Sequence, residues 1–207
     1  MAEKKKRSKR RSYLNDFHQD VTGEFRYTGK HHLYAGEYSG KKVRLLTALL
    51  TAALVLAAAG VGFIPAPSMT EQGVFYVLLP YIGELIAVFV TAWASLMLLR
   101  PVGSDGEKLR LRAYTFERSI GRLPHRTVIA AVLAGACVIA NVVFICIRGF
   151  EGKPVMSIAV ILLHIAAGAF AILLKRFAAS LEFTEDGGEA DAFRESEEIE
   201  NDPAPEE

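Results

Sequence analysis

Four long apolar runs constrain this chain more than any other feature. They cover residues 45–64, 73–99, 127–147 and 155–174. Each run is long enough to cross about 30 Å of hydrocarbon as a helix. Soluble core helices are usually shorter or amphipathic, and four such runs would be unusual in a soluble chain of 207 residues. The runs predict an all-α integral membrane four-helix bundle. They exclude a soluble globular domain, a disordered chain and a secreted disulfide scaffold.

Charge is segregated along the chain, although its 24 Lys and Arg nearly cancel its 23 Asp and Glu. Residues 1–44 hold 12 basic and 5 acidic side chains. Residues 100–126 hold seven basic and three acidic side chains. Residues 175–207 hold 3 basic and 12 acidic side chains. By the positive-inside rule, the N-terminal segment and the central loop are cytoplasmic, and an even number of spans returns the acidic tail there. We expect an integral plasma membrane protein, of a bacterial inner membrane, with N-in/C-in topology.

The N-terminal segment begins with a basic cluster and is too long for a signal peptide. Because 44 residues precede the first run, we expect that run to stay as a transmembrane helix. A disordered, topology-determining tail is the favoured interpretation of the cluster, and nucleic-acid binding is not expected. The candidates for contact with anionic lipid are Lys4, Lys5, Lys6, Arg7, Lys9, Arg10 and Arg11.

Two further segments outside the apolar runs carry aromatic residues, one before the first run and one in the central loop. Three Tyr-x-Gly units, at residues 27–29, 34–36 and 38–40, predict successive turns with tyrosine at the headgroup level. A partner-binding or phosphorylation motif is the alternative. In the central loop, apolar and aromatic residues alternate with arginine between Leu109 and Leu123, which predicts an interfacial segment.

The acidic tail has few apolar residues and contains Gly and Pro. From Glu182 onward we expect it to be disordered and dispensable for folding. Truncation after Leu181 should then leave stability nearly unchanged.

Polar and small side chains share one face of each run when the run is drawn as a helix. These faces should meet inside the bundle, because polar atoms find no partner in lipid and small residues allow helices to approach closely. The predicted faces are Thr47, Thr51, Ala58 and Gly62; Tyr81, Glu84, Val88, Thr91 and Ser95; Ala134, Cys137 and Asn141; and Ser157, His164 and Gly168.

Glu84 and His164 are the strongest functional candidates. Apart from tyrosine and cysteine, they are the ionisable side chains of the four runs. An ionisable group inside a membrane usually faces a partner or water. We expect the two to face each other, either as a tie between helices or as a proton or ion relay. The other intramembrane polar candidates are Asn141, Tyr81, Thr91 and Ser95.

No cofactor, metal site or enzymatic motif is expected. Cys137 and Cys146 lie nine residues apart in one run and cannot pair within a helix, so both are interpreted as small apolar residues. No metal-ligand spacing, HExxH or GxSxG motif occurs. The leading hypothesis is a non-enzymatic accessory or assembly subunit. It would act through helix packing and cytoplasmic contacts with lipids and with a protein partner or a second copy. The alternative is a small ion- or proton-coupled carrier that uses Glu84 and His164.

Overall fold

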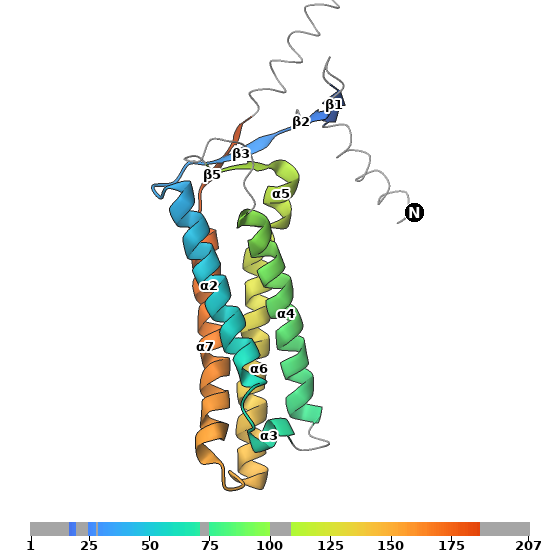
Figure 1. Cartoon of the computed structure of the whole chain (residues 1–207), viewed down its shortest axis with the longest axis vertical. Coiled ribbons are helices and arrows are strands. Elements are labelled where there is room, and N and C mark those ends of the chain that lie inside the picture. The colour runs from blue at the N-terminus through green and yellow to red at the C-terminus, as the bar shows by residue number, and fades with distance from the viewer. Residues whose placement is uncertain (1–16, 20–24, 28, 71–74, 100–108, 187–207) are drawn as a thin grey trace, which may run out of the picture.

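Four long helices form most of the structure, a computed structural model that describes residues 17–19, 25–27, 29–70, 75–99 and 109–186 (Figure 1). They are α2 (Gly40–Val61), α4 (Phe75–Leu99), α6 (Leu123–Arg148) and α7 (Pro154–Ala179). All four are long and apolar enough to cross a membrane, which confirms that each apolar run lies in a helix of spanning length. They lie side by side, with α2 and α6 each contacting both α4 and α7.

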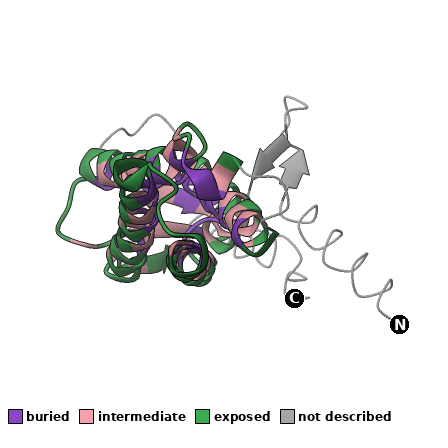
Figure 2. Cartoon of the chain, turned by 90° about the horizontal axis from the view of Figure 1, so that it is seen from below, coloured by how far each residue is buried: buried purple, intermediate pink, exposed green. Residues whose placement is uncertain are grey.

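The core between the four helices is built mainly from small residues, with buried positions recurring every three or four residues. Figure 2 shows this pattern as buried residues facing inward and exposed residues facing outward. Small side chains allow the helix backbones to approach closely. The largest core cluster contains Ala57, Ala58, Ala94, Ala130, Ala134, Ala167, Ala171 and Ala178, with Leu54, Val88, Leu123 and Leu174.

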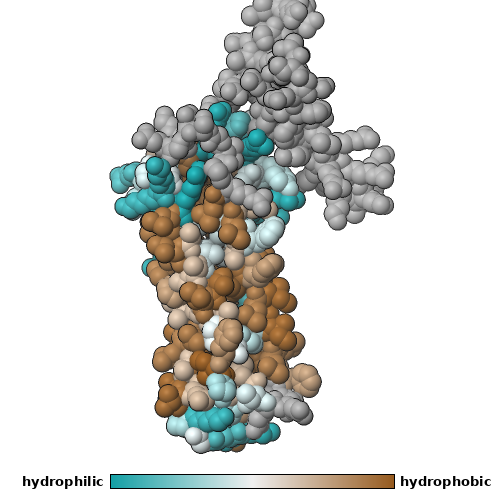
Figure 3. All heavy atoms as spheres, in the orientation of Figure 1, coloured by the Kyte–Doolittle hydropathy of each residue, from teal (hydrophilic) through white to brown (hydrophobic). Residues whose placement is uncertain are grey.

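The outer surface of the helices is apolar between two hydrophilic ends (Figure 3). Large apolar side chains are exposed on all four helices, including Leu56, Leu79, Val132 and Leu162. A soluble monomer rarely exposes apolar patches of this extent, so the pattern is typical of a lipid-facing surface.

Three of the helices extend beyond the apolar runs into charged sequence. Helix α2 begins at Gly40, where Ser39 accepts a hydrogen bond from the Lys42 amide at 3.3 Å. Such an N-cap satisfies one of the free amides of the first turn. Helix α6 begins at Leu123 with a proline in its first turn, and α7 continues through Lys175 and Arg176 to Ala179. Hydropathy marks the membrane-compatible part of a helix, whereas caps and prolines mark its ends.

Within the described residues, two short helices and five short strands accompany the long helices. Helix α3 (Pro67–Thr70) lies between α2 and α4, and α5 (Ala113–Arg118) precedes α6. Strands β1 (Phe17–Gln19) and β2 (Phe25–Tyr27) pair with each other in antiparallel fashion.

A three-stranded antiparallel sheet covers one end of the four helices (Figure 1). Strand β3 (His31–Tyr34) lies in its centre, between β4 (Arg110–Arg112) and β5 (Phe183–Asp186). His31 is opposite Arg112 in one pairing, and Tyr34 is opposite Phe183 in the other. The sheet therefore joins the segments before α2, before α6 and after α7. We call β3, β4, β5 and α5 the cap.

The cap has its own hydrophobic core, which continues into the ends of the helices. Buried Leu109 and Leu111 pack with Val43 of α2 and Leu98 of α4. An aromatic group lies beside them: the His32 and Phe116 rings stack at 4.0 Å, and Phe183 contacts both Phe116 and Tyr34. At the sheet margin, Lys30 donates a hydrogen bond to Glu185 at 3.1 Å and lowers the pKa of that carboxyl group.

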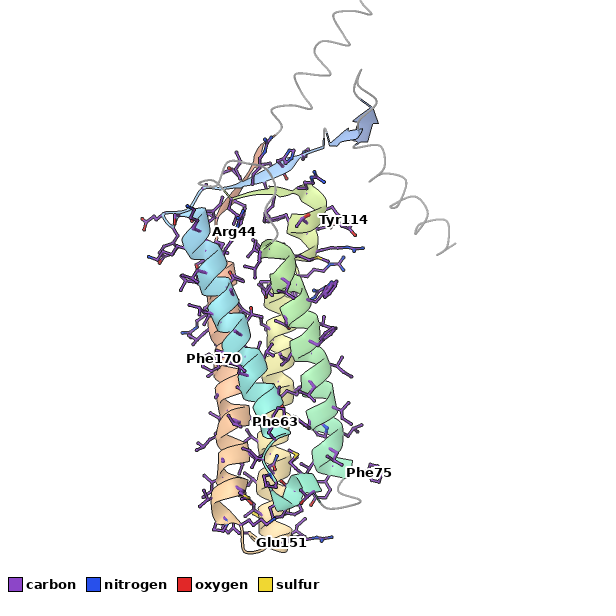
Figure 4. The ribbon with its side chains drawn as sticks, in the orientation of Figure 1. Arg44, Phe63, Phe75, Tyr114, Glu151 and Phe170 are labelled. Carbon is purple, nitrogen blue, oxygen red and sulfur yellow. The ribbon has the colours of Figure 1, made fainter. Side chains whose placement is uncertain are left out.

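The cap covers one end of the four helices, whereas a short turn joins α6 to α7 at the other end. Figure 4 shows Arg44 and Tyr114 at the cap end and Glu151 at the opposite end. At the opposite end, Glu151 in the short turn between α6 and α7 pairs with Arg148, the last residue of α6, at 4.0 Å.

The cap corrects three sequence-based expectations. The fold is mostly helical but not all-α, because β3, β4 and β5 form a sheet. The tail is not disordered from Glu182, since residues 183–186 pair with β3. Tyr34 and Gly36 do not simply form a turn: Tyr34 ends β3, and its ring covers Gly36 so closely that a side chain there would overlap it. Short strands that pair across long sequence separations carry no local pattern to reveal them.

We predict that the cap contributes to the stability of the whole chain. Truncation after Leu181 should lower the unfolding midpoint, whereas truncation after Asp186 should leave it unchanged. Phe183→Ala should cost about 1–2 kcal/mol, less than the loss of a fully buried phenylalanine, because Phe183 is only partly buried.

The unfolding midpoint is measured on the purified protein in detergent. The control is Thr184→Ala, because Thr184 is an exposed residue on the same strand. Equal midpoints for the two truncations would show that β5 adds nothing to the fold.

Candidate functional site

Three ionisable side chains from three different helices lie at one level of the structure. Glu84 is on α4, Cys137 on α6 and His164 on α7. At 1.5 Å per residue, each lies roughly 14–16 Å from the helix end opposite the cap and roughly 21–23 Å from the cap end. His164 lies 11 residues from both Lys153 and Lys175, about 16 Å in either direction. The three residues are therefore near the middle of the apolar region.

Glu84 and His164 are in contact, as their helix faces predicted. Glu84 Oε2 and His164 Nδ1 are 2.7 Å apart, and both side chains are 0% exposed. The distance is short enough for an ion pair or a shared proton. It does not satisfy hydrogen-bond direction, however: neither oxygen of Glu84 and neither ring nitrogen of His164 has a partner in hydrogen-bond geometry among the described residues. The two groups approach each other without pointing directly at each other.

Cys137 and Tyr81 complete the surroundings of this pair. One ligand-type atom from each of Glu84, Cys137 and His164 lies within 4.8 Å of the other two, and all three residues are buried. The Tyr81 ring meets the His164 ring edge-on, with centroids 5.9 Å apart. The Tyr81 hydroxyl donates to the Ala58 carbonyl of α2 at 3.3 Å. It also lies close to Gly62, where an added Cβ would be 2.9 Å from the hydroxyl oxygen. The cluster of Glu84, Cys137 and His164, with Tyr81 beside it, thus involves all four long helices. We call the first three residues the buried triad.

Asn141 belongs to a separate contact nearer the end opposite the cap. Its side-chain nitrogen donates to the Cys137 carbonyl at 2.9 Å, one turn earlier on α6. Its oxygen accepts a hydrogen bond from Ser68 of α3 at 2.7 Å, and both side chains are buried. Asn141 therefore ties α3 to α6.

Thr91 and Ser95 are buried on α4 as predicted, but they do not join the triad. Thr91 donates to the Ala87 carbonyl at 2.8 Å, and Ser95 donates to the Thr91 carbonyl at 3.1 Å. Bonds of this kind satisfy a hydroxyl within its own helix. Both residues have a structural role in this conformation.

The basic cluster from Lys4 to Arg11 lies outside the described residues, so its contact with lipid stays a prediction. Cys146, the second cysteine, is exposed on α6 and takes no part in the triad.

Two members of these polar contacts were missed from the sequence. The helix period places Cys137 on the inward face of its run, where a small apolar residue is the simplest interpretation, and a search for metal-ligand spacing along the chain gives no sign of its partners. The triad has no such spacing, because it joins residues 53 and 27 positions apart on three helices. Ser68 lies in the connection before α4, where no helical periodicity indicates its orientation.

The triad offers three kinds of chemistry. Its carboxyl and imidazole groups can share or pass on a proton. A thiol, an imidazole and a carboxylate are also the groups of a thiol nucleophile with its base and orienting acid. The same three groups supply nitrogen, sulfur and oxygen ligands for a transition metal. Complete burial excludes bulk solvent and substrate in this conformation.

We predict that Glu84 and His164 are energetically coupled. In a double-mutant cycle with Glu84→Ala and His164→Ala, the coupling should be about 0.5–2 kcal/mol, because each single change leaves the other group unpaired in an apolar core. Unfolding in detergent or lipid measures it. Additive effects of the two substitutions would argue against an interaction between the side chains.

We also predict that Ser68 stabilises the junction of α3 and α6. Ser68→Ala should cost about 1–2 kcal/mol, because it leaves the Asn141 oxygen buried without its donor. Ser157→Ala is the matched control, since buried Ser157 donates to the Lys153 carbonyl at the start of its own helix and ties no second helix within the described residues. If both serine variants unfold alike, the Ser68–Asn141 bond has no special role.

No family model matches this chain, and neither the curated proteins nor the solved structures gave a match.

Proposed function

We propose that this chain is a non-enzymatic, multi-pass integral membrane protein that acts by association, as an accessory or assembly subunit. The observation that carries the proposal is the cap. Three segments that are far apart in the sequence fold together at one end of four apolar helices. A chain of this kind presents a membrane-embedded surface for helix packing and a folded polar surface for contacts outside the membrane.

The arrangement of the outer surface supports a membrane location. Exposed phenylalanines lie near the end opposite the cap, where Figure 4 labels Phe63 and Phe75. Trp93 is exposed on α4 within two turns of its cap end. Aromatic side chains commonly occur near the two edges of a bilayer. Their positions agree with the apolar band between hydrophilic ends in Figure 3.

The cap supports the proposed orientation with both termini in the cytoplasm. Because β3, β4 and β5 pair directly, the segments that contain them must be on the same side of a membrane. Two of these segments are the basic N-terminal segment and the basic central loop. The positive-inside rule places such segments in the cytoplasm of a bacterial cell.

Helix α6 offers a surface on which another helix could pack. Gly135 is exposed, and nothing lies within 4 Å of the position that a side chain would take. Ala131, one turn earlier, lines an outward groove of about 500 Å³ between α6 and α7. Small residues one turn apart are a common feature of helix contacts in membranes. A partner helix or a second copy of the chain could approach α6 closely here.

Complete burial of the triad favours association over catalysis. A thiol hydrolase must bring its substrate to the cysteine, and Cys137 is 0% exposed.

The decisive experiment is purification of the tagged full-length protein from native membranes in mild detergent. We predict a stoichiometric complex, with a second protein or with another copy, that Gly135→Leu weakens by adding bulk to the open face of α6. Ala52→Leu is the matched control, because Ala52 is an exposed small residue on α2. A monodisperse monomer from native membranes, or equal loss of the complex in both variants, would contradict packing on α6.

Topology is tested separately. Reporter fusions after residues 30, 68, 113, 151 and 190 should report in, out, in, out and in. A periplasmic signal at residue 113 would contradict the proposed orientation.

A small ion- or proton-coupled carrier is the second candidate, and the contact between Glu84 and His164 near mid-depth favours it. Reconstitution into proteoliposomes separates the two functions. A carrier would move its ion or proton across the vesicle membrane and would lose this activity in Glu84→Gln while remaining folded. An accessory subunit would show no flux.

A further inference from the structure

The buried triad has electron-donating atoms that the described residues do not fully satisfy. The oxygens of Glu84 and the ring nitrogens of His164 are completely buried and lack a partner in hydrogen-bond geometry within the described part of the chain. Leaving such groups unsatisfied in an apolar environment costs free energy. Direct pairing only partly accounts for them, because the 2.7 Å contact is poorly directed. A third centre that both groups can bind would satisfy them better.

We infer that Glu84, Cys137 and His164 bind one divalent transition-metal ion of the zinc class. The three residues supply a carboxylate oxygen, a sulfur and an imidazole nitrogen, the ligand types that zinc takes in proteins. Magnesium and calcium prefer sites made of oxygen atoms alone, so the thiol and the imidazole disfavour them. This metal site is independent of the proposed association, since it concerns how the four helices are held together.

The geometry requires only small movements. Tetrahedral zinc with ligands at about 2.0–2.3 Å places its ligand atoms about 3.3–3.6 Å from one another. The three atoms of the triad already lie within 4.8 Å. The Glu84–His164 contact would open by about 0.6 Å, and Cys137 would approach by at most about 1.2 Å, which a change of side-chain torsion provides. The fourth position would be taken by water or another small ligand.

Charge balance favours a divalent ion at this depth. A carboxylate and a thiolate together carry two negative charges, and a neutral imidazole adds none. One divalent cation makes the site neutral, which limits the cost of placing ionised groups in an apolar interior. Binding would release the thiol proton and any proton shared by Glu84 and His164 to solvent.

Burial suits a structural metal rather than a catalytic one. The ligands come from α4, α6 and α7, while Tyr81 links the site to α2 through the Ala58 carbonyl. An ion can reach this site when the helices open transiently, so no permanent path from solvent is needed, and its binding energy adds to the stability of the fold.

Cobalt(II) is the most direct probe, because its absorption reports both a thiolate ligand and tetrahedral geometry. The full-length protein is purified in detergent, stripped with a chelator and titrated with cobalt(II) and then with zinc(II). We expect one cobalt per chain, a thiolate-to-cobalt charge-transfer band, and its loss when zinc displaces the cobalt. Excess magnesium should leave the band unchanged.

The exposed second cysteine provides the control. The chain has two cysteines, so a band that survives in Cys146→Ser must come from Cys137. Cys137→Ser should abolish the band, and Glu84→Gln or His164→Gln should weaken binding by about 100-fold or more, at least as much as loss of an outer-shell partner. His125→Ala, an exposed histidine on α6, should bind as the wild type does.

Zinc should also raise the unfolding midpoint of the wild type and of Cys146→Ser, but not that of Cys137→Ser. The inference is overturned if the wild type binds no stoichiometric cobalt, or if the charge-transfer band disappears in Cys146→Ser. Because the Cys146→Ser result needs no change in the buried core, a failure of the triad variants to fold would not prevent the test.

Discussion

The absence of water from an apolar helix interior is the constraint on which this structure depends. Each backbone and side-chain polar group there must be satisfied within the protein. Three hydroxyl groups meet this requirement by donating a hydrogen bond to the carbonyl four residues earlier, namely those of Thr91, Ser95 and Ser157. The side-chain oxygen of Asn141 does so by accepting a hydrogen bond from Ser68. Glu84 and His164 cannot do so alone, because each carries an ionisable group at 0% exposure. Their mutual contact, and the position of Cys137 beside them, follow from this constraint.

The small side chains of the core make the contact possible. Alanines at the meeting faces bring α2, α4, α6 and α7 close together, so that side chains of moderate length can touch across the interior. Gly168, for example, lies where an added side chain would meet Ala134 at 3.5 Å. The cap adds a second constraint at one end. By pairing β3 with both β4 and β5, it links the segments before α2 and α6 to the segment after α7.

The helices and the central polar pair could be predicted from the sequence because their signals are local. Twenty consecutive apolar residues indicate a spanning helix, and the spacing of Glu84 with Thr91 and Ser95 indicates its inward face. The cap could not be predicted, because strands of three or four residues gain their stability from partners far along the chain. To predict that Cys137 lies beside Glu84 and His164, one must know the relative heights of α4, α6 and α7. Helix periodicity gives the face on which a residue lies but not its level relative to a neighbouring helix.

Nitrogen NMR of the histidine rings in lipid nanodiscs tests the central claim, that Glu84 and His164 meet inside the four helices, most directly. The chain has five histidines, and His164→Gln assigns the signals of His164 by their disappearance. If the account is correct, Glu84→Gln will shift both ring-nitrogen signals of His164, while Glu182→Gln, an exposed change beside the cap, will leave them in place. His164 signals that are unaffected by Glu84→Gln, or that exchange freely with water, would contradict it.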